Sequence, residues 1–208
     1  MQGTEAVIKA FTKFLYRDVV FALGGSVIIV TLLYAFEKIP APKCPIAAYK
    51  YVVAAGVSYA IGYAVQDFFS LLGLVRTGAA VPPNVFGRFL YRLFERDPRE
   101  LKSFTSEDYG KAWHWLYQKE TPERYRDNHE RTESLKQVGT VFGPCFAISG
   151  VILLKVYFSN GKNFDLTIAV ASIILGIVLW SLGWLKVTQQ AQYLLKYKQI
   201  AESKTTKQ

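Results

Sequence analysis

Four long apolar runs decide what this chain can fold into. They cover residues 19–36, 46–75, 138–158 and 166–185. A helix needs about 20 apolar residues to cross the hydrocarbon core of a bilayer, and each run can reach that length. A soluble fold of 208 residues would have too little polar sequence to cover four such runs. The sequence therefore predicts an all-α integral membrane protein with four transmembrane helices.

The distribution of basic residues predicts the orientation of these helices. Most of the 25 lysine and arginine residues lie in the two termini and in the region 77–136. Because cytoplasmic segments are enriched in lysine and arginine, both termini and this region are predicted to be cytoplasmic, in a bacterial inner membrane or a plasma membrane. The formal charge of +9 then favours contact with anionic lipid headgroups.

The same reasoning divides the chain into five segments. No helix breaker separates the charged segment after Pro122 from the third apolar run, so a single helix is expected from Pro122 to about Tyr157, with a kink at Gly143-Pro144. The segments are an amphipathic N-terminal segment (1–17), transmembrane helices 1 and 2 (18–76), a cytoplasmic helical region (77–136), transmembrane helices 3 and 4 (137–187) and a cytoplasmic tail (188–208).

Two polar residues, Gln66 and Asp67, interrupt the second apolar run. An ionisable group inside a span is a functional hypothesis by default. One interpretation places Asp67 at the inner boundary, where it pairs with a nearby arginine or lysine such as Arg17, Arg76 or Lys186. The other interpretation places Gln66 and Asp67 in the lining of an ion-conducting pore.

Small residues recur at four-residue spacing in two of the apolar runs. Such rows let helix backbones approach closely, and they predict helix packing within one subunit and between subunits of a homo-oligomer. The predicted packing residues are Gly56, Ala60 and Ala64 in the second run, and Gly139 and Gly143 in the third.

A basic amphipathic helix is predicted at the start of the cytoplasmic region. Arg88, Arg92 and Arg96 recur every fourth residue, and Phe86 and Phe89 belong to the apolar face. This pattern is typical of a helix that lies on a membrane surface or docks a cytoplasmic protein. Acidic residues nearly balance basic ones between residues 76 and 136, which argues against a nucleic-acid partner.

The motifs of nucleotide-binding and metal-dependent enzymes are absent, so no catalytic residue, cofactor or metal site is predicted. One short pattern remains. Arg124 and His129 have the R-x4-H spacing, which is similar to the motif of HEPN-type ribonucleases. Those enzymes usually carry a polar residue after the arginine, where this sequence has Tyr125. A solvated charged helix is the default interpretation of this segment.

Three functions are compatible with these features. The leading hypothesis is a non-enzymatic homo-oligomer that holds or regulates a cytoplasmic partner protein at the inner membrane, as membrane subunits of signalling or anti-phage defence systems do; that comparison rests on layout alone. The first alternative is an oligomeric ion-conducting pore with Asp67 in or near the pathway. The second is a membrane-tethered HEPN-like ribonuclease.

Overall fold

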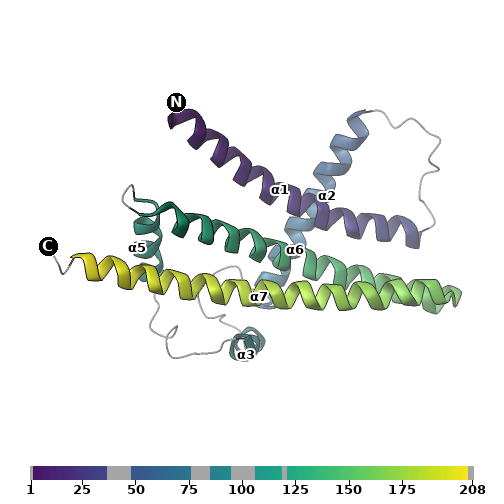
Figure 1. Ribbon diagram of the computed structural model, residues 1–208. Helices are drawn as coiled ribbons and strands as arrows, with labels where there is room; N and C mark the ends of the chain where they lie inside the picture. The colour runs from purple at the N-terminus through teal and green to yellow at the C-terminus, as the bar shows by residue number, and fades with distance from the viewer. Residues whose placement is uncertain (1, 37–47, 76–84, 95–105, 119–120, 206–208) are drawn as a thin grey trace. The chain divides into compact units, whose positions relative to one another are not determined.

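The computed structural model describes residues 2–36, 48–75, 85–94, 106–118 and 121–205 of the chain (Figure 1). Every regular element in these ranges is an α-helix, which confirms the all-α part of the predicted fold class for the described residues. The helices are α1 (Gln2–Ala35), α2 (Ala48–Leu71), α3 (Val85–Phe94), α5 (Ser106–Leu116), α6 (Glu123–Asn160) and α7 (Asn163–Thr205).

Three of these helices are long and apolar enough to cross a membrane. They are the Tyr16–Ala35 part of α1, the whole of α6, and the Asn163–Leu194 part of α7. They indicate a membrane-embedded protein. The predicted fourth span, α2, is not among them, so four spans are not shown by the described residues.

Three of the helices, α1, α6 and α7, are longer than the apolar runs that they contain. The predicted uninterrupted helix is confirmed: α6 has 38 residues, about 57 Å at 1.5 Å per residue, and it continues through Pro144. α7 has 43 residues and continues to Thr205, through most of the predicted cytoplasmic tail (188–208). α1 likewise begins at Gln2 and continues without a break past residue 17, where the amphipathic segment was expected to end.

The chain forms two compact units. The first comprises residues 1–69 and 137–181, and the second comprises residues 70–136 and 182–208. α6 and α7 contribute to both. The divisions fall close to the ends of the apolar runs at residues 138 and 185, so the first unit contains most of the apolar sequence and the second contains most of the charged sequence.

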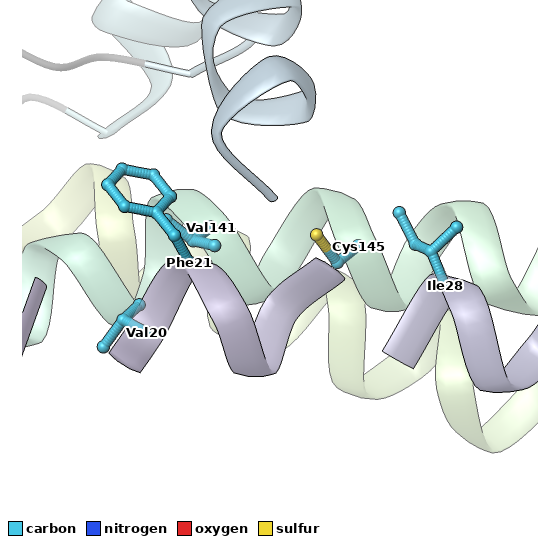
Figure 2. Packing of buried hydrophobic residues seen from close by; sticks show 5 residues of the cluster. All are labelled: Val20, Phe21, Ile28, Val141 and Cys145. Atoms are coloured by element: carbon cyan, nitrogen blue, oxygen red, sulfur yellow. The ribbon is translucent and has the colours of Figure 1, made fainter. Parts of the chain in front are cut away.

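α1 and α6 share a buried apolar core in the first unit. Val20, Phe21 and Ile28 of α1 pack with Val141 and Cys145 of α6, and all five are buried (Figure 2). The ring of Phe21 also makes edge contacts with two tyrosines of α2, at centroid distances of 5.6 and 5.5 Å. The stretch of α1 around Phe21 therefore packs against both α6 and α2.

Glycines allow the helices of the first unit to pack backbone against backbone. A Cβ atom added at Gly25 of α1 would collide with the carbonyl oxygen of Ser58 in α2, and one added at Gly62 of α2 would collide with the carbonyl oxygen of Phe21. α6 and α7 also approach closely, because a Cβ at Gly143 would lie 2.8 Å from the backbone of Trp180. Such contacts are typical of membrane helices, which gain little from the hydrophobic effect when they associate.

A tight turn and a buried carboxylate organise the end of the first unit where α6 meets α7. Gly161 has φ +67°, and its N–H donates to the carbonyl of Tyr157 at 2.7 Å, which ends α6. The carboxylate of Asp165, in the first turn of α7, is fully buried. It accepts hydrogen bonds from the Tyr34 hydroxyl of α1 at 2.6 Å and from the Asn160 amide of α6 at 2.7 Å.

The close approach of α1 and α2 gives a prediction with an internal control. Gly62→Ala should lower the free energy of unfolding by about 1–3 kcal/mol, because the methyl group forces two backbones apart. Gly56→Ala makes the same chemical change on the same helix, but nothing lies within 4 Å of a Cβ at that position. Gly56→Ala should therefore leave stability unchanged or raise it slightly.

The measurement is chemical or thermal unfolding of both variants in a detergent that keeps the chain monomeric. Equal stability of the two variants would contradict the close packing of α1 on α2.

Candidate functional site

The basic helix predicted from the sequence exists as α3. Arg88, Arg92 and Phe89 are exposed on it, whereas Leu90 is buried. Phe86 belongs to α3, and the structure does not describe its side chain; Arg96 lies outside the described residues. The structure therefore brings one apolar and two basic members of the predicted set to a single exposed surface.

The two polar residues of α2 have different surroundings. Gln66 is half-buried, and its amide donates to the hydroxyl of Thr140 in α6 at 2.9 Å. Asp67 is exposed on α2. Arg17, one of its expected partners, contacts the neighbouring Asp18 at 3.8 Å. Gln66 thus has a packing role in the first unit, and Asp67 faces away from the contacts of that unit.

The two predicted rows of small residues also have different surroundings, since one is buried and the other is exposed. Gly139 and Gly143 of α6 are buried, and Gly143 lies against Trp180 of α7. Gly56, Ala60 and Ala64 of α2 are all exposed, since α2 turns Ser58 and Gly62 toward α1 instead. The contact between α1 and α2 therefore uses residues outside the predicted row.

The most unusual feature of the second unit is a buried polar cluster between α6 and α7. It consists of His129, Glu133 and Lys136 of α6 with Gln190 of α7. The ammonium group of Lys136 lies 2.8 Å from a carboxylate oxygen of Glu133 and donates to the Gln190 carbonyl oxygen at 3.2 Å. The Gln190 amide nitrogen donates to Glu133 at 2.5 Å and lies 3.4 Å from Nε2 of His129.

These contacts determine the orientation of the Gln190 amide. Lys136 can only donate, so it faces the carbonyl oxygen of Gln190, and the ionised carboxylate of Glu133 can only accept, so it faces the amide nitrogen. The same nitrogen lies 3.4 Å from Nε2 of His129, and this contact is a hydrogen bond only in the tautomer that leaves Nε2 without a proton.

α5 covers the cluster and links it to an aromatic core. The ring of Trp113 meets the ring of His129 edge to face at 5.0 Å. Ala112 and Leu116 of α5 pack with Leu194 and Tyr197 of α7, and all four are buried. Burial raises the pKa of Tyr197 to about 12, with smaller contributions from Tyr193 and Tyr125, so its phenol stays protonated and donates to the carbonyl of Tyr125 at 3.3 Å.

This arrangement stabilises the pairing of α6 with α7, and it does not expose reactive groups to a substrate. His129 is fully buried, whereas Arg124 is exposed, with its guanidinium 5.0 Å from the centre of the Tyr125 ring. A general acid or base must come within hydrogen-bond reach of its substrate. The geometry of this pair therefore gives no support to the ribonuclease hypothesis.

No residue of the cluster except His129 was singled out from the sequence. The signal was nevertheless present, because His129, Glu133 and Lys136 are spaced by four and three residues and so lie on one helix face. The partner on α7, Gln190, belongs to a segment without such a pattern. Among the described residues, no three histidine, cysteine or acidic side chains are grouped as metal ligands would be.

Comparison with known proteins adds no further constraint on the site. No protein-family model, no curated protein and no solved structure matches the chain.

The cluster predicts unequal effects at two neighbouring glutamines. Gln190→Leu should lower the free energy of unfolding by about 1–3 kcal/mol, because the buried Lys136 and the half-buried Glu133 each lose a hydrogen-bond partner. Gln189→Leu is the control, since Gln189 is exposed and accepts only a surface hydrogen bond from Lys186. It should change stability by less than about 0.5 kcal/mol.

Hydrogen exchange localises the effect. Gln190→Leu should accelerate amide exchange in the 123–136 part of α6, and exchange in the 140–155 part should change less. Similar protection of both variants throughout α6 would show that the cluster does not stabilise the second unit.

Proposed function

We propose that this protein is a non-enzymatic, homo-oligomeric membrane protein that holds or regulates a cytoplasmic partner protein at the inner membrane. The observation that carries the proposal is the sharing of α6 and α7 by two units, each with its own buried core. A polar unit with its own core presents an ordered surface. Because its two longest helices, α6 and α7, also contain segments that are apolar enough to cross a membrane, that surface is covalently continuous with the membrane anchor.

We include α2 as a fourth membrane span in this proposal. Its backbone contact with α1 through Gly62 is of the kind that membrane helices use. The face of α2 away from α1 exposes Val53, Val57 and Phe68, which water would leave poorly solvated. A lipid environment, or a second subunit, accounts for such a surface.

Four spans place both termini and the region 77–136 on the same side of the membrane. The excess of lysine and arginine in these segments favours the cytoplasmic side. In this arrangement Ser159, in the last turn of α6, lies on the opposite side. The exposed row Gly56, Ala60 and Ala64 of α2 is then available for contact between subunits, and homo-oligomerisation through it is part of the proposal.

Cysteine labelling in intact cells tests the topology. In a background with Cys44→Ser and Cys145→Ala, Ser159→Cys should react with a membrane-impermeant maleimide, and Gly110→Cys on α5 should react only after the cells are permeabilised. Both positions are exposed in the structure. An epitope at the N-terminus should share the behaviour of Gly110, because α2 returns the chain to the starting side. If the epitope and Gly110 lie on opposite sides, α2 does not cross the membrane.

Site-specific photo-crosslinking tests the partner. A photoreactive amino acid at Gln118, which is exposed after α5, should capture a discrete cytoplasmic protein in native membranes. The same residue at Phe158, which is 80% exposed near the far end of α6, serves as the control and should capture only lipid or membrane proteins. Identical capture at both positions, or none at Gln118, would contradict partner binding by the second unit.

The ion-conducting pore is the second candidate, and one observation favours it. Asp67 is exposed on α2 beside the exposed row of small residues, so a symmetric assembly through that row would bring copies of this carboxylate near one another. A ring of carboxylates sets the selectivity of many cation channels. Conductance measurements on reconstituted wild type and Asp67→Asn separate this candidate from the first.

A further inference from the structure

α3 exposes a row of large apolar side chains. Val85, Phe89 and Leu93 follow each other at four-residue spacing, and they are 77%, 60% and 64% exposed. Soluble surfaces rarely leave three such neighbours uncovered on a ten-residue helix. Another surface is therefore expected to cover this row, and the other residues of α3 indicate which kind of surface it is.

The burial of Leu90 fixes which face of α3 is presented. Leu90 is 5% exposed, whereas Val85, Phe89 and Leu93 lie on a neighbouring face that points outward. Arg88 and Arg92 precede Phe89 and Leu93 by one residue each, and both are exposed. No acidic residue occurs anywhere in α3. The outward surface of α3 is thus apolar along one line and positively charged along the adjacent line.

We propose that α3 lies flat on the anionic headgroup layer of the membrane that holds this chain. Val85, Phe89 and Leu93 enter the boundary between headgroups and acyl chains, and the guanidinium groups of Arg88 and Arg92 contact lipid phosphates. An apolar line bordered by arginines, without acidic residues, complements a surface that is apolar below and negatively charged above.

Chain connectivity favours the membrane over a protein as the occupant. Val75, the last described residue after α2, is ten residues before Val85, so their Cα atoms are at most about 35 Å apart. In the proposed topology this distance keeps α3 beside the inner leaflet permanently, whereas a soluble partner would have to compete at its cellular concentration. The inference rests on the membrane insertion of the proposed function, but not on its partner.

The charge contribution can be stated as a ratio. Each basic residue close to an anionic leaflet favours the bound state by a factor of about 5. Replacement of both Arg88 and Arg92 by glutamine should therefore shift the equilibrium between seated and unseated α3 by roughly 30-fold toward the unseated form. Arg131→Gln, at an exposed position of α6, is the matched control and should leave the equilibrium unchanged.

The experiment uses the full chain reconstituted in vesicles of phosphatidylcholine with or without phosphatidylglycerol. In a background with Cys44→Ser and Cys145→Ala, an environment-sensitive fluorophore is attached at Phe89→Cys or, as a control, at Gly110→Cys of α5. Lipids that carry a spin label just below the headgroup should quench the Phe89 fluorophore, most strongly with phosphatidylglycerol. They should not quench the fluorophore at Gly110.

The arginine variants complete the test. Arg88→Gln with Arg92→Gln should abolish the extra quenching that phosphatidylglycerol causes, and Arg131→Gln should retain it. Equal quenching at positions 89 and 110 would overturn the proposal. So would blue-shifted emission at Phe89 without lipid quenching, because a protein surface or a second copy of this chain would then cover α3. Alkaline extraction of the same vesicles reports membrane insertion separately, so failure of α3 seating is distinguishable from failure of the membrane assignment.

Discussion

Direct backbone contact between helices is the constraint on which the first unit depends. Between apolar helices in lipid, burial of more apolar surface gains little, so dispersion at short distance and a few hydrogen bonds must supply the stability. Gly25 and Gly62 permit that distance between α1 and α2, and Gly143 permits it between α6 and α7. The polar contacts, such as Gln66 with Thr140, then find partners because the backbones are already close.

The elements with the strongest periodicity or length were predictable. The apolar runs of α1, α6 and α7, the uninterrupted course of α6 and the amphipathic character of α3 all follow from composition and spacing, which are local properties. The face that α2 turns toward α1 was not predictable in the same way. Gly56 and Gly62 are both glycines on one helix, and only the tertiary arrangement decides that Gly62 is the one in contact.

The polar cluster illustrates why the rest of the site could not be derived from one sequence. The spacing of His129, Glu133 and Lys136 on one face of α6 can be read from the sequence. The register of α7 cannot, and this register places Gln190 opposite these residues rather than Gln189 or Gln192. Another register of α7 against α6 would leave Lys136 and Glu133 without the Gln190 amide that bridges them. Buried polar groups of this kind are best known for selecting one helix register over others.

The Asp165 contacts also constrain the order of events when the chain is made. Tyr34 lies at the end of α1 and Asp165 begins α7, so the two groups are separated by 131 residues. During synthesis α1 emerges long before its partner, and its Tyr34 hydroxyl must find water or lipid headgroups in the meantime. The burial of Asp165 therefore belongs to the last steps of assembly, after the α6–α7 hairpin has been inserted. A truncated chain that ends before α7 would leave this end of α1 without its carboxylate acceptor, which gives cellular quality control a physical means to distinguish complete from incomplete copies.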